Sequence, residues 1–386
     1  MSQQIVFKNA RMVLPNEVVH GSLAVTRGRI ESFDQTSTGS VGAVIDVEGD
    51  YLLPGLVEMH TDNFERHLMP RPKVHWAEVP ALLAHDAEIA AAGITTVFDA
   101  LGVGEADIDS LRGTAWNNVI RTIDTCAESN LLRADHYLHV RCELPAPNTI
   151  ELFEPFREHR RLSLISLMDH TPGQRQWENI ERARTYYTGR KGWSNQKFDQ
   201  QVAHSATLQE KYAAPHRTYF VDYCRSYGIA LASHDDTTAA HVEQAHDEGA
   251  TMSEFPTTMV AARKARERKL ATVMGGPNVV RGGSHSGNVA AAELARAGLL
   301  DILSSDYVPG SLLSAVMRLV NDEILTLPEA VATVTSAPAN ATGLYDRGAI
   351  RNGLRADLVQ MRLVDFNNGT RQAVVRAVWR EGNRVL

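Results

Sequence analysis

The pattern of apolar and polar positions gives both ends of the chain the same texture. Short runs rich in β-branched and aromatic residues are separated there by Gly and Asn turns, which is typical of β-strands. We predict such strands at 5–7, 22–25, 29–33, 357–361 and 374–379. Neither end carries enough apolar residues to fold alone, so we expect 1–53 and 345–386 to form one small β-sandwich domain together.

Between these ends, apolar runs alternate with amphipathic helical patterns. The apolar runs predict strands that end near Met59, Ala100, Cys142, Met168, Ser233, Phe255, Gly275 and Ser304. Helical patterns lie between them, as at 81–92, 115–129, 260–269 and 289–297. Apolar strands that are each followed by a helix are typical of parallel βα units, and eight of them predict an α/β fold, a TIM (β/α)8 barrel, at 54–344.

One segment of the predicted barrel breaks this rhythm. Residues 174–217 are polar and aromatic, with a mostly helical pattern. The segment is too long for a simple loop, so we predict a helical insertion that lies over the barrel mouth as a lid.

Composition narrows the class of protein. The 386 residues are 44% hydrophobic and 22% charged, which is ordinary for a globular protein, and the formal net charge of -7 argues against nucleic-acid binding. The N-terminus lacks the features of a signal peptide, and no stretch approaches the roughly 18 apolar residues that a membrane helix needs. The three cysteines are widely spaced and predict no disulfide framework. We therefore expect a cytoplasmic protein without a membrane or nucleic-acid partner.

The first candidate strand of the barrel ends in His60-Thr61-Asp62. Because side chains alternate along a strand, His60 and Asp62 can point at one ion. An imidazole together with a carboxylate suits Zn²⁺, Mn²⁺ or Fe²⁺. Taken alone, the motif fits a buried histidine and a capping aspartate equally well.

Four further apolar runs end in a side chain that can bind a metal ion. These side chains are Glu143, His170, His234 and Asp306. The carboxyl ends of parallel barrel strands meet at one face, so we expect these groups to converge with His60 and Asp62. The sequence therefore predicts a metal centre at the barrel mouth.

This arrangement resembles the amidohydrolase superfamily. Its members build a β-sandwich from both chain ends, open the barrel with His-x-His or His-x-Asp, and complete the site with a carboxylated Lys or a Glu, two single His and a final Asp. The resemblance implies that Glu143 takes the bridging position and that Asp306 is a metal ligand or the catalytic proton acceptor. We expect Zn²⁺, with Mn²⁺ or Fe²⁺ as alternatives. Because His-x-Asp replaces the commoner His-x-His, one or two ions per chain both stay open.

A narrower resemblance covers nearly the whole chain. It rests on the blocks 60–67, 70–72 with Trp76, 168–174, 254–258, 281–288 and 304–307. These blocks look like those of the triphosphate diphosphatase family in the carbon–phosphorus lyase pathway of phosphonate catabolism. The resemblance implies a phosphoric-anhydride hydrolase that converts α-D-ribose 1-methylphosphonate 5-triphosphate to the 5-phosphate and pyrophosphate.

A small, strongly anionic sugar-phosphate substrate needs local positive charge in this acidic chain. We predict that the Gly-rich loop 281–288 binds phosphate through Arg281, Ser284, His285 and Asn288. Its glycines can turn backbone N–H groups toward a phosphate, and we expect a helix to begin at Asn288. A Gly-rich loop that merely ends in a helix cap is the plainer interpretation.

Two further residues are predicted to contact the substrate. Arg141 lies two positions before Glu143 and can face the same pocket, although a structural ion pair explains it equally well. His67 lies just beyond the first metal motif, where a solvated surface position is the alternative.

Other functions share parts of this pattern. A cyclic amidase or nucleobase deaminase of the same superfamily would use the metal motif but would not need Arg281 and His285. A non-catalytic subunit of a phosphonate-processing assembly would not need intact metal ligands. Barrels of this kind are often homodimers, and a homodimer is the assembly we expect, although the sequence itself does not determine it.

Overall fold

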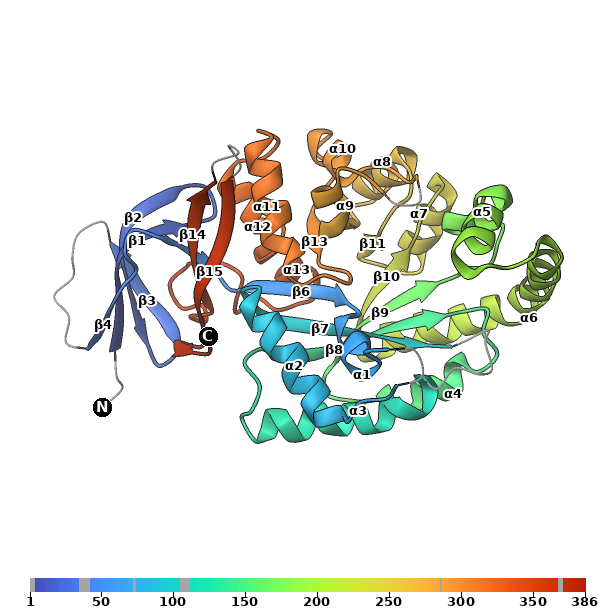
Figure 1. The fold of residues 1–386 in the computed structure, drawn as a ribbon, viewed down its shortest axis with the longest axis horizontal. Helices are drawn as coiled ribbons and strands as arrows, with labels where there is room; N and C mark the ends of the chain where they lie inside the picture. The colour runs from blue at the N-terminus through green and yellow to red at the C-terminus, as the bar shows by residue number, and fades with distance from the viewer. Residues whose placement is uncertain (1–3, 35–41, 72–73, 105–111, 285–286, 367–370) are drawn as a thin grey trace.

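The computed structural model describes residues 4–34, 42–71, 74–104, 112–284, 287–366 and 371–386. Its strands form two sheets of eight, one built from both ends of the chain and one from the middle. Figure 1 shows the terminal sheet at one end of the molecule and the second sheet, surrounded by helices, at the other. This arrangement confirms the predicted fold class.

The terminal sheet joins the two ends of the chain through one central strand. Its strands are β1 (Gln4–Val13), β2 (Val18–Thr26), β3 (Arg29–Asp34), β4 (Ala43–Asp46), β5 (Tyr51–Pro54), β14 (Leu358–Asp365), β15 (Arg371–Arg380) and β16 (Asn383–Arg384). Strand β5 pairs in parallel with β1 and antiparallel with β14. The rings of Phe7 and Trp379, from opposite ends of the chain, pack edge to face at 4.9 Å in the buried core of this sheet.

The second sheet is the predicted barrel. Its strands are β6 (Leu56–Thr61), β7 (Ile94–Val103), β8 (Asp135–Glu143), β9 (Leu162–Met168), β10 (Ala230–His234), β11 (Met252–Glu254), β12 (Ala271–Gly275) and β13 (Ile302–Ser304). Each pairs in parallel with its neighbour in chain order. In Figure 1 the arrowheads of β6 to β9 point away from the terminal sheet, so the carboxyl ends of the strands lie at the far end of the molecule.

The barrel closes between β6 and β13 at the residues predicted to bind metal. Thr61 and Asp306 form a parallel bridge, and the Asp306 N–H donates to the His60 carbonyl over 3.1 Å. The buried carboxylate of Glu58 accepts hydrogen bonds from the backbone N–H groups of His60 at 2.7 Å and Ser305 at 2.5 Å. Closure of the fold and placement of His60 and Asp306 therefore depend on the same contacts.

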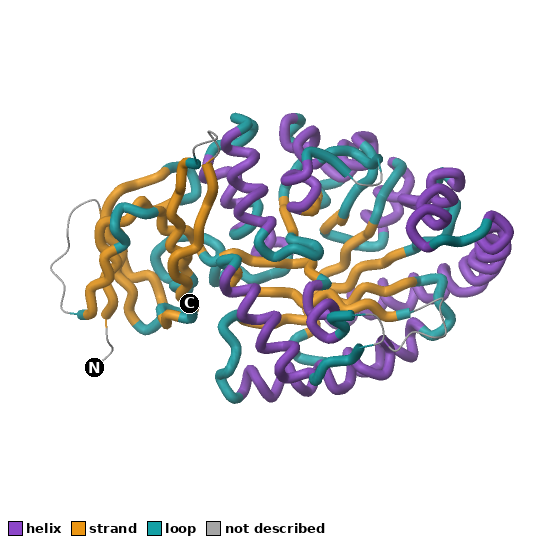
Figure 2. The backbone as a smooth tube through the Cα atoms, viewed as in Figure 1, coloured by secondary structure: helices purple, strands orange, loops and turns teal. Residues whose placement is uncertain are grey.

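Helices cover the outside of the barrel (Figure 2). They are α1 (Asn63–Leu68), α2 (Glu78–Ala91), α3 (Arg112–Glu128), α4 (Thr149–Phe153), α7 (Ala239–Asp247), α8 (Met259–Glu267), α9 (Gly276–Arg281), α10 (Ala291–Arg296), α11 (Ser311–Asn321), α12 (Leu327–Ala332) and α13 (Ser336–Ala341). Helix α11 shows why such segments are helical: Leu312, Ala315, Val316 and Leu319 recur at helical spacing and are all buried. Burial of that apolar face holds the helix against the barrel.

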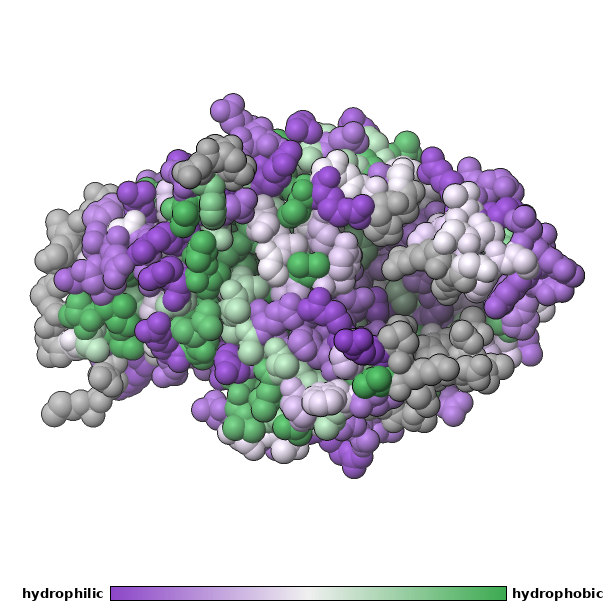
Figure 3. All heavy atoms as spheres, in the orientation of Figure 1, coloured by the Kyte–Doolittle hydropathy of each residue, from purple (hydrophilic) through white to green (hydrophobic). Residues whose placement is uncertain are grey.

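The predicted insertion consists of a 3₁₀ turn, η2 (Arg175–Trp177), and two helices, α5 (Ile180–Lys191) and α6 (Asn195–Tyr227). Helix α6 does not end near residue 217. It continues for ten residues and buries Phe220 and Cys224 in the core cluster that also holds barrel residues, so the insertion passes directly into the barrel wall. Figure 3 shows mainly hydrophilic side chains on the visible face of this end of the molecule.

Two sequence-based expectations concern the whole fold. All three cysteines are buried, and none is paired with another in the structure. Within the described ranges, no helix combines the length and the apolar character that crossing a bilayer requires.

Candidate active site and metal centre

A cavity opens at the carboxyl ends of the barrel strands. Its wall includes His60, Arg141, His234, Asp235 and Asp306 from the strand ends, Gln176, Trp177 and Tyr186 from the insertion, and Arg281, Ser284 and Asn288 from the loop after α9. Strands far apart in the sequence thus bring most of the predicted site residues to one place. The insertion contributes part of the wall, as expected of a segment that covers the barrel mouth.

Two histidines of this site share one buried carboxylate. Glu254, at the end of β11, accepts from Nδ1 of His60 at 3.0 Å and from Nδ1 of His234 at 3.2 Å. Ser166 donates to the same carboxylate over 2.6 Å. Because Nδ1 of each imidazole is hydrogen-bonded to Glu254, Nε2 is the ring atom that remains to bind a metal ion. This arrangement is typical of metal-binding histidines.

The electrostatics of this group follow from its burial. Burial alone would raise the pKa of Glu254, but the neighbouring His60 and His139 hold it well below the ordinary value. Burial alone would lower the pKa of His60, but the Glu254 carboxylate raises it. Burial lowers the pKa of His139 to about 3, so this histidine is neutral inside the barrel.

His170 is oriented by a second carboxylate. Its backbone N–H donates to Oε1 of Glu143 at 2.9 Å, and its Nδ1 lies 2.5 Å from Oε2 of the same residue. Burial would raise the pKa of Glu143, but His170 lowers it. The structure thus brings Glu143 to the site with both carboxylate oxygens hydrogen-bonded to His170.

Of the groups of ligand atoms that could hold a metal ion, the one formed by His170, His234 and Asp235 lies at the mouth of the barrel. Nε2 of His170 and Nε2 of His234 each lie 3.7 Å from Oδ2 of Asp235, and the three atoms fall within 4.8 Å of one another. Two imidazoles oriented through Nδ1, together with one carboxylate, form a donor set that fits a divalent metal. His60, whose ring stacks on that of His234 at a centroid distance of 5.6 Å, lies directly beside this group.

The backbone around the site is strained. Asp235, Phe255 and Asp306, the first residues after β10 and β11 and two residues after β13, all have left-handed φ angles of 54°, 52° and 56°. This conformation is uncommon for non-glycine residues, although Asp adopts it more readily than most, and such residues are often found at functional sites. The strain aims the Asp235 side chain back toward the imidazoles.

Asp62 and Asp306 lie at the point of barrel closure. The Asp62 N–H donates to the Asp306 carbonyl at 3.1 Å, and Asp62 precedes the first turn of α1. Asp306 lines the cavity, and burial raises the pKa of its carboxyl group. Among the described residues, neither aspartate belongs to the compact group of His170, His234 and Asp235, and their predicted roles as metal ligands stay predictions.

The predicted phosphate loop at 281–288 differs from the expectation in the role of its glycines and in where the next helix begins. The N–H groups of Gly282 and Gly283 donate to the Val279 and Asn278 carbonyls and end α9, so they are not free to face a phosphate. The predicted helix does not begin at Asn288 but at Ala291, and this helix has only six residues. The glycines serve to terminate a helix, because a left-handed residue such as Gly282 is the usual way to do so.

The side chains of this loop nevertheless face the cavity. Arg281, Ser284 and Asn288 line its wall, whereas His285 lies outside the described residues. Arg141 also lines the cavity, and its Nη2 lies 3.7 Å from Oε1 of Glu65. Its Nε atom is buried without a hydrogen-bond partner among the described residues, so a donor is available toward the cavity.

His67 is not brought to the cavity. Its Nε2 lies 2.9 Å from Oε2 of Glu88 on α2, and Arg66 donates to the same carboxylate. The side chain is half-buried in this contact between α1 and α2, and it is absent from the described cavity wall. The expectation of a substrate contact therefore has no support from its position.

Sequence reasoning gave little weight to two residues that matter here. The left-handed backbone that places Asp235 beside the imidazoles leaves no readable signal in the sequence. The two histidine partners of Glu254 lie 194 and 20 residues away, so the sequence pattern does not reveal the carboxylate that they share.

A second buried cluster lies between α2 and the barrel, away from the cavity. Asp99 accepts from Nε2 of His85 and Nδ1 of His136, each at 2.8 Å, and Asp86 lies 3.3 Å from His136. All four side chains are fully buried. The hydrogen bonds account for these groups without a metal, so we interpret this cluster as a structural network.

Comparisons with known proteins agree with this picture. The chain is 45% identical over 384 residues, covering 99% of it and 100% of the relative, to a protein of Escherichia coli (strain K12) named alpha-D-ribose 1-methylphosphonate 5-triphosphate diphosphatase. The solved structure of molinate hydrolase covers 100% of this chain and 95% of its own at 14% identity, with a TM-score of 0.67. That of N-isopropylammelide isopropylaminohydrolase from Burkholderia multivorans covers 99% and 98% at 17% identity, with a TM-score of 0.63. At these identities the two structures establish the fold alone.

The family is established by the sequence. The model of the family described as "Amidohydrolase family" matches residues 87–386, which is most of the chain. Enzymes of this family are metal-dependent hydrolases, in agreement with the ligand groups at the barrel mouth. The chain therefore belongs to the amidohydrolase family.

Proposed function

We propose that this protein hydrolyses α-D-ribose 1-methylphosphonate 5-triphosphate to α-D-ribose 1-methylphosphonate 5-phosphate and pyrophosphate, as a step of phosphonate catabolism in the cytoplasm. The observation that carries the proposal is the 45% identity, over the full length of both chains, to the Escherichia coli protein named for this activity. The cavity chemistry supports it independently, since Arg141 and Arg281 line the same cavity as His234 and Asp235 of the metal-binding group.

We propose Zn²⁺ as the metal, held by His170, His234 and Asp235 with His60 beside them. Imidazole nitrogen and carboxylate oxygen are ligands that zinc prefers. A bound divalent metal would lower the pKa of a coordinated water molecule and neutralise charge on a phosphoryl oxygen. Whether one or two ions bind depends on whether His60, Asp62 and Asp306 form a second site.

The protein's own residues supply the rest of the chemistry. A triphosphate gathers negative charge as its anhydride bond breaks, and Arg141 and Arg281 present guanidinium groups on two parts of the cavity wall. Asp306, which lines the same cavity, is positioned to accept the proton of the attacking water. Trp177 and Tyr186 from the insertion narrow the access of bulk water to the cavity.

The main alternative is another activity of the same family, such as a cyclic amidase or nucleobase deaminase. Those substrates carry no polyphosphate and do not need a cationic cluster formed by Arg281 with its polar neighbours Ser284 and Asn288. Turnover of dihydroorotate, a hydantoin or adenine that is unaffected by R281A would favour this alternative. The family membership gives no reason to prefer it over the activity of the 45% identical relative.

Phosphorus NMR of the triphosphate substrate with zinc-loaded enzyme tests the proposal. We expect the triphosphate signals to be replaced by one pyrophosphate signal and one monophosphate ester signal. When a chelator has first removed the metal from the enzyme, we expect the triphosphate signals to persist. Absence of pyrophosphate with the metal present, or stepwise release of orthophosphate, would reject the proposed reaction. Homodimer formation stays a prediction, which light scattering on the same sample measures.

A further inference from the structure

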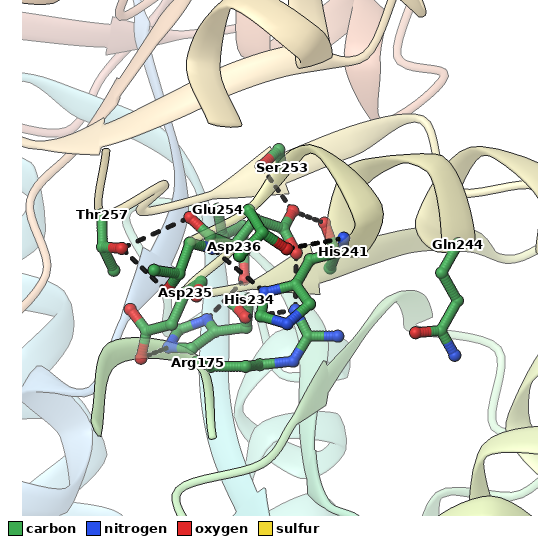
Figure 4. Close-up of polar contacts among 12 residues, drawn as sticks. Arg175, His234, Asp235, Asp236, His241, Gln244, Ser253, Glu254 and Thr257 are labelled. Carbon is green, nitrogen blue, oxygen red and sulfur yellow. Dashed lines mark hydrogen bonds and ion pairs between the residues drawn. The ribbon is translucent and has the colours of Figure 1, made fainter. Parts of the chain in front are cut away.

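Arg175 is a buried cation that the proposed reaction does not use. It begins η2 in the insertion, and only 4% of it is exposed. Its Nη1 atom donates to the carbonyl oxygen of His234 at 3.0 Å and to Oδ1 of Asp236 at 2.5 Å. Figure 4 shows the guanidinium group lying against the turn that runs from His234 to Asp236, whereas Gln244 points away from it.

Asp236 is held in place by several hydrogen bonds at the end of that turn. It is fully buried, and the hydroxyl groups of Ser233 and Ser253 donate to its Oδ2 atom. Its backbone carbonyl accepts from the N–H of Thr257 at 2.8 Å. Strands β10 and β11 and the insertion are therefore joined at this carboxylate, and the Arg175 cation balances its buried charge.

The residue between the two contacts of Arg175 is Asp235. Its left-handed φ of 54° is uncommon for a non-glycine residue, and the contacts on both sides of Asp235 hold this conformation. Arg175 fixes the carbonyl on one side of Asp235 and the side chain on the other. The N–H of Asp235 itself donates to the Glu254 carbonyl at 2.9 Å, so the turn is fixed from three directions.

Arg175 also connects this turn to the cavity wall. The next two residues of η2, Gln176 and Trp177, line the cavity. Arg175 itself has a left-handed φ of 44°, and the N–H of Glu178 donates to its carbonyl to close the turn. The short turn η2 thus places the side chain of Arg175 on the 234–236 turn, and those of Gln176 and Trp177 on the cavity that the substrate would occupy.

We propose that Arg175 is a positioning residue: it holds the 234–236 turn in its left-handed conformation and so keeps Asp235 beside His170 and His234, which makes metal retention depend on this one contact of the insertion. The inference rests on the proposed function only for the identity of the metal. It predicts that loss of the Arg175 contacts releases Asp235 from its left-handed conformation, even though Arg175 touches neither the metal nor the substrate.

The rate of zinc loss to a chelator tests this inference without any substrate. Zinc-loaded enzyme is challenged with EDTA, and zinc release is followed with a chromogenic indicator for the wild type, R175M and R217M. The matched control is Arg217 of α6, which ties the same insertion to Glu248 at 2.9 Å and, in the part of the chain that the structure describes, makes no hydrogen bond or ion pair to the 234–236 turn. We expect R175M to release zinc at least about tenfold faster and R217M to stay within about twofold of the wild type.

A second variant keeps the inference falsifiable if R175M is too unstable. R175M leaves the Asp236 carboxylate buried without its cation, whereas R175M/D236N removes both charges and retains the hydrogen-bond acceptor for the two serines. We expect fast zinc release from this double variant also, together with a lower kcat and a little-changed KM. Wild-type zinc retention in either folded variant, or equally fast release from R217M, would overturn the inference. Failure of the wild type to cleave the triphosphate would reject the proposed function and leave the zinc measurement intact.

Discussion

Oδ2 of Asp235 lies 3.7 Å from Nε2 of His170, although the two residues follow different strands of the barrel. The same oxygen lies 3.7 Å from Nε2 of His234. A carboxylate that faces two imidazole nitrogens, each held from behind through Nδ1, is an arrangement that a metal ion would complete. This relationship makes Asp235 the residue whose loss should affect metal binding most specifically.

Replacement of Asp235 by asparagine should reduce bound metal. D235N preserves shape and the capacity for the left-handed conformation but removes the anionic oxygen, so we expect metal affinity to fall at least about tenfold and kcat to fall with it. Elemental analysis after equilibrium dialysis against a metal buffer measures the change. D247N is the matched control, since Asp247 is exposed on α7. Equal metal content in D235N and D247N would contradict the assignment.

Replacement of Glu254 by glutamine should weaken the site without destroying the fold. The amide oxygen can still accept one hydrogen bond, but it cannot serve both His60 and His234 as the carboxylate does. We expect metal affinity to fall roughly 10- to 100-fold, as is typical when the partner that orients a ligand is lost. Metal titration measures this, with thermal unfolding alongside. Unchanged affinity in a folded E254Q protein would show that the shared carboxylate does not orient the ligands.

Replacement of Arg281 by alanine should impair use of the triphosphate. A hydrogen bond to a charged group contributes about 1.5 to 3 kcal/mol, so we expect kcat/KM to fall roughly 10- to 100-fold, mainly through KM. R296A is the control, because Arg296 is exposed on α10 and lies outside the described cavity wall. Steady-state pyrophosphate release measures both variants. A similar KM for R281A and the wild type would remove Arg281 from the substrate site.

The second buried cluster, formed by His85, Asp86, Asp99 and His136, should make the stability of the fold depend on pH. Burial alone would lower the pKa of His136, but the Asp99 and Asp86 carboxylates raise it to about 9. A histidine whose folded pKa exceeds its unfolded value stabilises the fold fully below pH 6.5, and this contribution is lost as the pH rises through 9. Each pKa unit corresponds to about 1.4 kcal/mol, so the contribution of His136 to the free energy of unfolding amounts to roughly 3 kcal/mol at low pH.

Thermal unfolding of the wild type and H136Q at pH 6, 7.5 and 9 measures this effect. We expect H136Q to be clearly less stable than the wild type at pH 6 and the difference to shrink toward pH 9. A difference that stays constant over this range would show that His136 carries no extra proton in the folded protein.

The sequence predicted the barrel well because its signals are local. The predicted strand ends at Met168, Gly275 and Ser304 coincide with the ends of β9, β12 and β13, since each apolar run stops where the strand leaves the core. The predicted joining of both chain termini in one sheet also holds, because neither end had enough apolar residues for a core of its own.

The details of the site could not be predicted in the same way. Strand alternation placed His60 and Asp62 on one face, but the chain turns into α1 after Thr61, so the alternation ends before Asp62. The roles of Asp235 and Arg175 depend on left-handed backbone angles and on a contact between residues about 60 positions apart, neither of which leaves a pattern in the sequence. Side chains at strand ends could therefore be named, but not their division between metal ligands and orienting groups.

Anomalous scattering from crystals of the zinc-loaded protein, collected on both sides of the zinc absorption edge, tests the central claim most directly. We predict a peak within coordination distance of Nε2 of His170, Nε2 of His234 and Oδ2 of Asp235, with any second peak toward His60 and Asp306. A zinc peak at His85, Asp99 and His136 instead, or no peak at the barrel mouth, would contradict it.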